Sequence, residues 1–169
     1  MARNIEIKAR VSDMDALRAA VAAIATEGPT GILQDDTFFA CPNGRMKLRD
    51  FATGEGELIF YRRGDLAGPK ESEYFRSPTT AVASLREALA LGYGEIGRVR
   101  KHRTLYLVGR TRVHLDEVEG LGQFLELEVV LAEGESAQAG IDEAQDLMTR
   151  LGIAPSALVR GAYVDLARS

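Results

Sequence analysis

The sequence predicts an antiparallel α+β fold that is built on eight strands. Two observations carry this prediction: polar and apolar residues alternate with period two in eight short segments, and turn-forming residues separate many of these segments. A third observation is the length of 169 residues, which is typical of one domain. Because the loops are short throughout, we expect a single domain over residues 1–169.

The first half of the chain reads as a strand, a helix and three further strands. Residues 4–11 alternate, with Glu6 and Lys8 on one face and Ile5 and Ile7 on the other. A helix is expected after the N-cap candidate Asp13, running through an alanine-rich segment towards residues 28–29. Residues 34–40, 45–51 and 57–63 are the next predicted strands.

The second half repeats this order and adds a closing helix. A short strand is expected over residues 70–76, and Ser77 and Pro78 are expected to open a helix, since proline is tolerated in a first turn. Strands follow over residues 99–108, 112–118 and 122–131, and a helix over residues 136–151. No repeat is visible at the level of residues, so only the architecture is predicted to be duplicated.

Composition excludes several classes of protein. The single cysteine, Cys41, excludes an internal disulfide framework and a multi-cysteine zinc site. The longest apolar run, residues 19–25, is far shorter than the ~20 residues that span a bilayer. A net charge of −4 does not favour binding to nucleic acid or to an anionic membrane. We therefore expect a cytoplasmic protein with no nucleic-acid or membrane partner.

Charge is segregated by strand. Basic residues share one face of two strands and acidic residues one face of another: Arg45, Lys47 and Arg49; Lys101 and Arg103; Glu126 and Glu128. Alternation alone favours an open sheet whose charged face meets water. Like charges on neighbouring positions repel, however, and this favours a closed eight-stranded barrel in which a polyanion meets the bases and a cation meets the acids.

Several motifs resemble, in order, those of the CYTH superfamily, the triphosphate tunnel metalloenzymes. These motifs are Asn4-Ile5-Glu6-Ile7-Lys8, Asp36-Thr37-Phe38-Phe39, Arg45-Met46-Lys47-Leu48-Arg49, Phe60-Tyr61-Arg62, Lys101-His102-Arg103, residues 114–122, Phe124-Leu125-Glu126-Leu127-Glu128, and Tyr163-Val164-Asp165-Leu166. The segment around residues 116–128 is most similar to the class IV adenylyl cyclases.

The resemblance implies an eight-stranded antiparallel closed β-barrel, a triphosphate tunnel with helices packed outside, that holds Mg²⁺ or Mn²⁺. The metal-binding acids that it implies are Glu6, Asp116, Glu126 and Glu128. The phosphate-binding bases are Lys8, Lys47, Arg49, Arg62, Lys101 and Arg103, of which Lys8, Lys101 and Arg103 are the expected catalytic residues.

Two reactions are compatible with the resemblance. The protein would either cyclise ATP to cyclic AMP and pyrophosphate or hydrolyse a triphosphate, for which ATP, tripolyphosphate and thiamine triphosphate are the candidates. The alternative is a module that binds a nucleotide or polyphosphate without turnover. The net charge argues against recognition of RNA 5′-triphosphate ends. A homodimer is compatible with the resemblance but is not required by it.

The most serious departure from the family pattern lies at residue 4. Asn4 replaces the first glutamate of the N-terminal signature, so we expect one working metal ion or a weak dependence on metal. We expect His114 to be a hydrogen-bonded residue of the tunnel rather than a metal ligand, and His102 to lie outside the tunnel. The glycines of residues 92–97 match a dinucleotide fingerprint, but they precede a strand and are expected to form a helix cap and loop.

Overall fold

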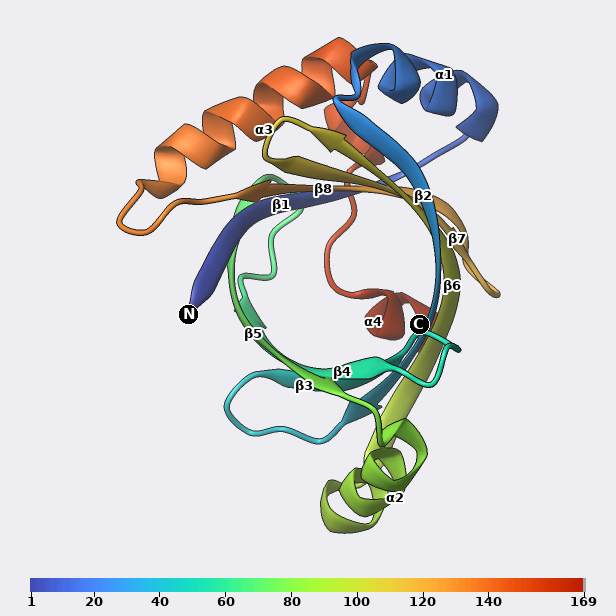
Figure 1. Cartoon of the computed structure of the whole chain (residues 1–169). Helices are drawn as coiled ribbons and strands as arrows, with labels where there is room; N and C mark the ends of the chain where they lie inside the picture. Colours follow the sequence, from blue (N-terminus) through green and yellow to red (C-terminus); the bar gives the residue numbers. More distant parts are fainter. Residues whose placement is uncertain (169) are drawn as a thin grey trace.

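Eight antiparallel strands close into a barrel in the computed structural model, which describes residues 1–168 (Figure 1). The strands are β1 (Ala2–Arg10), β2 (Glu27–Phe39), β3 (Arg45–Asp50), β4 (Gly56–Arg63), β5 (Lys70–Thr79), β6 (Glu95–Val108), β7 (Thr111–Val118) and β8 (Gly122–Val130). Their order around the barrel is β1-β5-β4-β3-β2-β6-β7-β8, and β8 pairs with β1 to complete the ring. The prediction of a closed eight-stranded barrel is confirmed.

Two helices cover one side of the barrel. Helix α1 (Met14–Ile24) begins where the side chain of Asp13 accepts a hydrogen bond from the Ala16 amide at 3.0 Å, as the sequence predicts. Helix α3 (Ala137–Leu151) lies beside it and contacts β1 and β8. Gly140 allows this close approach, because a Cβ atom there would lie 2.6 Å from Ile5.

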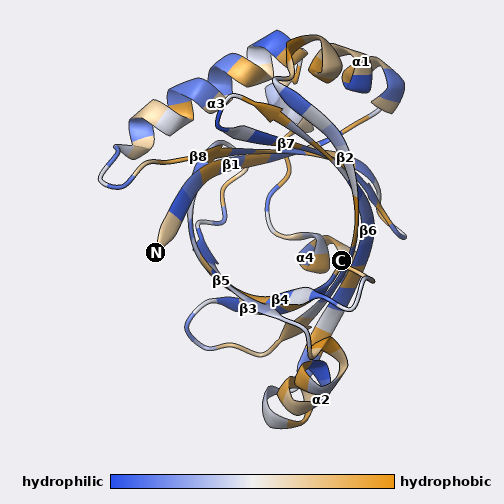
Figure 2. Ribbon diagram, viewed as in Figure 1, coloured by the Kyte–Doolittle hydropathy of each residue, from blue (hydrophilic) through white to orange (hydrophobic). Residues whose placement is uncertain are grey.

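The outward-facing residues of β1, β7 and β8 form the main core with these helices. Members of this core include Ile7, Val21, Leu115, Leu127 and Leu147, all of which are buried. Helix α2 (Val82–Tyr93) covers a smaller apolar group on β2 and β3. In Figure 2 apolar and hydrophilic residues are mixed along α1, α2 and α3, as expected of helices with one face on a sheet. No helix within residues 1–168 has both the length and the apolar character needed to cross a membrane.

The start of α2 differs from the prediction. Ser77 and Pro78 continue β5, where Pro78 pairs with Glu57 of β4, and α2 begins only at Val82. Proline is compatible with this end of β5 because Pro78 lies beyond the residues of β5 that pair with β1. Pairing with β4 therefore overrides the local signal for a helix start.

The C-terminal segment returns to the barrel and closes one end of it. After the short helix η1 (Pro155–Ala157), helix α4 (Tyr163–Ala167) lies within the ring in the view of Figure 1. Tyr163 and Val164 pack against residues of the barrel interior, among them Phe38, Val99 and Phe124. Gly97 of β6 is part of this fit, since a Cβ atom there would overlap the side chain of Val164. The three longer helices thus pack outside, whereas α4 seals one end.

Candidate active site inside the barrel

A cavity of about 260 Å³ occupies the barrel, and side chains from all eight strands line it. Alternation explains why the lining of the cavity is charged. In most strands the apolar residues face outward, and the charged residues that alternate with them face inward. Eight lysine and arginine side chains and five carboxylates line the cavity, an excess of three positive charges. A polyanion is therefore the ligand class that this interior favours.

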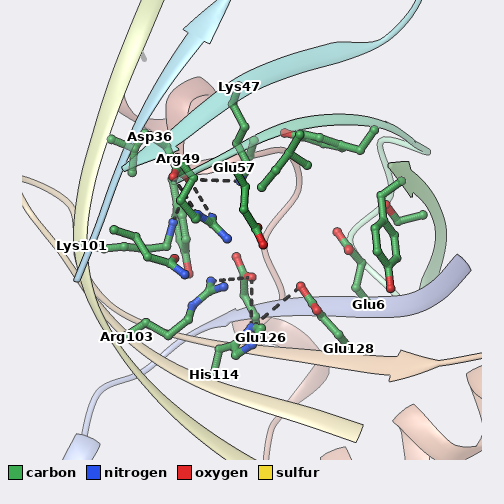
Figure 3. A pocket seen from close by; sticks show the side chains of 18 of the residues that line it. Glu6, Asp36, Lys47, Arg49, Glu57, Lys101, Arg103, His114, Glu126 and Glu128 are labelled. Atoms are coloured by element: carbon green, nitrogen blue, oxygen red, sulfur yellow. Dashed lines mark hydrogen bonds and ion pairs between the residues drawn. The ribbon is translucent and has the colours of Figure 1, made fainter. Parts of the chain in front are cut away.

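Three cations meet at one carboxylate on the β2–β3–β6 side of the cavity, which we call the basic wall (Lys47, Arg49, Lys101 and Asp36). Arg49 forms two hydrogen bonds of 2.8 Å to Asp36, and the Nζ atoms of Lys47 and Lys101 lie 3.1 and 3.2 Å from the same carboxylate. Figure 3 shows these side chains converging from three strands. The register explains the convergence, since Asp36 pairs directly with Arg49.

Burial sets the protonation of the basic wall. Burial opposes the ionised form of Asp36, but Arg49, Lys101 and Lys47 together hold the pKa of this carboxyl well below its usual range. Burial lowers the pKa of Lys101 to about 7, with Arg49 and Arg103 lowering it further and Asp36 opposing them. The pKa of Lys47 falls to about 8 for the same leading reason. These two ammonium groups are therefore only partly compensated, and an added anion would stabilise their charged forms.

A second group of side chains lies on β7 and β8, which we call the acidic wall (His114, Glu126 and Glu128). One ligand atom from each of these residues lies within 4.8 Å of the others. The Nδ1 atom of His114 is 3.8 Å from an oxygen of each glutamate and has no hydrogen-bond partner among residues 1–168. Figure 3 shows this group across the cavity from Lys47.

The acidic wall fits a divalent metal ion by its donor set. Carboxylate oxygens are the preferred ligands of Mg²⁺ and Mn²⁺, and imidazole is also a ligand for transition metals. The unpartnered buried Nδ1 atom of His114 supports this fit, because a buried polar atom normally has a partner. Burial opposes the ionised form of Glu126, but ion pairs with Lys8 and Arg103 keep its pKa well below its usual range, and His114 adds to this effect. The carboxylate therefore stays ionised, and a metal ion would compete with Lys8 and Arg103 for it.

Glu6 points into the cavity beside the acidic wall, but it is already paired. Its carboxylate accepts a short hydrogen bond from Arg63 of β4. Burial raises the pKa of Glu6, as do Glu128 and Glu126, while Arg63 opposes them. Glu6 thus faces the cavity beside the other acids, and a metal ion would compete with Arg63 for its carboxylate.

Lys8 lies at the junction of the cavity and the C-terminal segment. Its Nζ atom is 3.4 Å from Glu126, donates a hydrogen bond of 3.0 Å to the carbonyl of Gly161, and lies 4.0 Å from the centre of the Tyr163 ring. Burial lowers the pKa of Lys8. The residue therefore links the acidic wall to the closed end of the barrel.

Asp116, an expected metal-binding acid, has both carboxylate oxygens engaged by neighbouring side chains. Its two oxygens accept hydrogen bonds of 2.7 Å from Arg103, and the hydroxyl of Tyr163 donates a third at 2.7 Å. The side chain is fully buried and does not line the cavity. In this arrangement Asp116 orients Arg103, which also reaches Glu126 at 3.0 Å.

Arg62 lies outside the cavity, which corrects its expected role as a phosphate ligand. Its Nε atom donates to the carbonyl of Asn43 at the exposed surface. Glu57, Ile59, Tyr61 and Arg63 are the residues of β4 that line the cavity, so the inward parity places Arg63 where Arg62 was expected. His102 is exposed, as predicted.

The remaining predicted residues are brought together, and several others join them. Glu6, Lys8, Lys47, Arg49, Lys101, Arg103, Glu126 and Glu128 all line one cavity. Four residues with no expected role in the site also line the cavity: Asp36, Glu57, Arg63 and Tyr163. His114, expected to be a tunnel residue rather than a metal ligand, lines it as well. Side chains alternate between the two faces of a strand, so the alternation along β2, β4 and β7 could have predicted most of these residues to face inward.

Comparison with known proteins places the chain in a family. The model of the CYTH domain matches residues 2–163. Adenylate cyclase CyaB of Aeromonas hydrophila is 29% identical over 96% of this chain and 87% of its own length. The structure of the PH1012 protein of Pyrococcus horikoshii superposes with a TM-score of 0.86 at 23% identity, covering 96% of this chain and 98% of the other.

A more distant structure is HpAC1 of Hippeastrum, described as a proposed adenylyl cyclase with a dominant triphosphatase activity. It superposes with a TM-score of 0.58 at 18% identity, covering 89% of this chain and 88% of the other. At this identity the likeness concerns the fold.

Proposed function

Because this chain belongs to the CYTH domain family, we propose that it is a metal-dependent enzyme that processes a triphosphate and cyclises ATP to cyclic AMP and pyrophosphate. The similarity to adenylate cyclase CyaB over almost the whole chain supports the choice of reaction. One observation carries the proposal: the basic wall and the acidic wall face each other across a single cavity.

The basic wall would replace the water that a triphosphate loses when it enters the barrel. Arginine offers paired donors to phosphate oxygens, and lysine offers a compact charge. We assign phosphate binding to Lys47, Arg49, Lys101 and Arg103, all of which line the cavity. Lys101 and Arg103 would stabilise charge that develops on the leaving pyrophosphate, and Lys8 would hold the far end of the phosphate chain beside Glu126.

His114, Glu126 and Glu128 would hold Mg²⁺ or Mn²⁺, with Glu6 close by. Such an ion lowers the barrier to attack at phosphorus by neutralising phosphate charge and by lowering the pKa of an oxygen nucleophile. In cyclisation the 3′-hydroxyl oxygen of the ribose bonds to the α-phosphorus, pyrophosphate leaves, and the hydroxyl proton passes to solvent. The arginines of the cavity would keep the phosphate chain in line for this attack.

Hydrolysis of a triphosphate is the second candidate. The basic wall contacts phosphate whether or not a nucleoside is attached, so tripolyphosphate and thiamine triphosphate are also possible substrates. In hydrolysis water takes the place of the ribose hydroxyl. The same residues would serve both reactions, and the products distinguish them.

Product analysis tests the proposal. Purified protein is incubated with ATP, tripolyphosphate or thiamine triphosphate in the presence of Mg²⁺ or Mn²⁺. Cyclic AMP with pyrophosphate is the expected result, whereas orthophosphate identifies hydrolysis. Binding without any product would identify a non-catalytic module and overturn the proposal.

A matched pair of double variants gives the control. Glu126→Ala with Glu128→Ala is expected to abolish turnover. Glu117→Ala with Glu119→Ala removes two glutamates at the same spacing from exposed positions and is expected to leave turnover unchanged. Activity retained in the first variant would remove Glu126 and Glu128 from the metal site.

A further inference from the structure

An amide oxygen without a partner lies in the cavity wall at Gln34. The side chain of this residue lines the cavity, and the residue is only 5% exposed. Its Oε1 atom is buried and has no hydrogen-bond partner among residues 1–168. Leaving a buried acceptor unpaired costs free energy, so a donor on a ligand would account for its place here.

The position of Gln34 in the barrel restricts which donor this is. Gln34 of β2 pairs with Lys101 of β6, so it lies next to the basic wall. A phosphate oxygen cannot satisfy Oε1, because both atoms are acceptors. A donor on another part of the ligand, close to the phosphates, would satisfy this atom.

An apolar surface adjoins Gln34 on the same side of the cavity. Ile32 is the next inward residue of β2, and Leu105 of β6 is diagonal to it, since Leu105 pairs with Thr30. Phe51 follows β3 and also lines the cavity. All three side chains are half-buried, which leaves part of each open to a ligand. The surface of Ile32, Phe51 and Leu105, which we call the apolar shelf, provides a face on which a flat ring can pack.

The closed end of the barrel decides how a nucleotide would lie. Tyr163 and Val164 fill the end bounded by Phe38, Val99 and Phe124. The apolar shelf lies towards the opposite end, where Arg76 is exposed and Glu57 is half-buried. A nucleoside triphosphate would therefore enter with its terminal phosphate first. Its nucleoside would remain at the open end beside Gln34.

We propose that Gln34 and the apolar shelf bind the nucleobase of a nucleoside triphosphate, and that Gln34 selects adenine by accepting a hydrogen bond from its exocyclic amine. A glutamine amide can pair in a bidentate way with the amine and N7 of adenine, which makes adenine the best match. This inference rests on the proposed function and adds the residues that recognise the base. Inosine presents a carbonyl in place of the amine and would leave Oε1 unpaired.

The test measures equilibrium binding by calorimetry without added metal, so that no turnover occurs. The ligands are ATP, inosine triphosphate and tripolyphosphate. The wild-type protein is expected to bind ATP about tenfold more tightly than inosine triphosphate, as one hydrogen bond would give. Gln34→Met keeps the length of the side chain but removes the acceptor, and it is expected to bind the two nucleotides equally.

Tripolyphosphate and a surface variant separate this inference from the proposed function. Gln34→Met is expected to keep the wild-type affinity for tripolyphosphate, which also shows that the variant folds. Gln123→Met replaces an exposed glutamine and is expected to keep the preference for ATP.

Three other outcomes would contradict one or both proposals. Equal binding of ATP and inosine triphosphate by the wild type, or a preference that survives in Gln34→Met, overturns the role of Gln34 while the triphosphate site stands. Failure of the wild type to bind any of the three ligands overturns both proposals.

Discussion

Arg103 and Asp116 lie directly opposite each other on β6 and β7 and are joined by two parallel hydrogen bonds of 2.7 Å. The pair is almost completely buried. Because Tyr163 donates a third hydrogen bond to Asp116, the pair also connects the basic side chains to the closed end of the barrel. Asp116 thus fixes the position of an arginine that we assign to phosphate binding.

Replacing Asp116 tests this positioning role. Asp116→Asn keeps the size of the side chain but leaves Arg103 with only Glu126 as a charged partner. We expect the free energy of unfolding to fall by about 3 kcal/mol, because an uncompensated buried charge remains. Urea denaturation measures this loss. Affinity for tripolyphosphate should also fall, whereas affinity for Mn²⁺ should stay within about threefold, unlike the loss of ~10-fold or more that follows when a ligand or its support is removed. A large loss of Mn²⁺ affinity would return Asp116 to the metal site.

His114 provides the second prediction. His114→Ala removes one of the three candidate ligands, so we expect the affinity for Mn²⁺ to fall by at least ~10-fold. Calorimetric titration with the metal alone gives this affinity. The exposed His102 offers a matched control, and His102→Ala should leave it unchanged. An unchanged affinity in His114→Ala would limit the site to carboxylates.

The pKa of Lys101 predicts how phosphate binding depends on pH. In the free protein this pKa is lowered to about 7, chiefly by burial, with Arg49, Arg103 and Lys47 adding to the effect and Asp36 opposing it. Phosphate favours the charged ammonium, so affinity should be greatest below pH 7. It should fall as pH rises, by up to about tenfold per pH unit while Lys101 loses its proton.

The variant Lys101→Arg isolates this contribution, because arginine stays charged throughout the range. Titrations with tripolyphosphate between pH 6 and 9 should show a much smaller fall in this variant below pH 8. Above pH 8 some fall should remain, since burial lowers the pKa of Lys47 to about 8. Identical pH profiles for the two proteins would show that Lys101 does not bind the phosphate chain.

Asn4 gives a prediction about metal dependence. Its side chain lines the cavity two residues before Glu6, is 3% exposed, and has an unpartnered Oδ1 atom. Asn4→Glu adds a negative charge here, so Mn²⁺ should bind about tenfold more tightly and activity should depend more strongly on metal. The control is Asn43→Asp, which adds the same charge at an exposed position. An unchanged metal requirement in Asn4→Glu would show that Asn4 does not limit metal binding.

Gly97 tests the closure by α4. A Cβ atom there would overlap Val164, so Gly97→Ala should displace α4 and lower the free energy of unfolding by about 1–3 kcal/mol. Hydrogen exchange of residues 161–167 should become faster in this variant. Gly92→Ala places a methyl group in open space on α2 and should stabilise the protein slightly. Unchanged exchange in Gly97→Ala would mean that α4 is held by other contacts.

Much of the fold could be predicted from the sequence because each strand carries its own alternation. The predicted strands lie within or close to the observed ones, and Asp13 caps α1 as expected. Pro78 shows the limit of local reasoning. Proline does favour the first turn of a helix, but Pro78 pairs instead with Glu57, which lies on a strand distant in sequence.

Strand alternation predicts which side chains face the cavity, but it does not predict the contacts that these side chains make with distant segments. The motif Phe60-Tyr61-Arg62 predicts Arg62, whereas alternation from Glu57 through Tyr61 points to Arg63. Asp116 has the inward parity of a ligand, yet its partners Arg103 and Tyr163 come from distant segments and occupy its oxygens. Helix α4 has five residues, too few for a periodic pattern, so its place inside the barrel could not be predicted.

Because Tyr163 and Val164 fill one end of the barrel, a ligand would reach the cavity from the opposite end. A nucleotide bound as we propose would enter and leave by the same opening, so depth would fix the order of product release. Cyclic AMP, nearer the opening, would leave first. Pyrophosphate, deeper among the lysines and arginines, would follow and would exclude the next molecule of ATP until it had left.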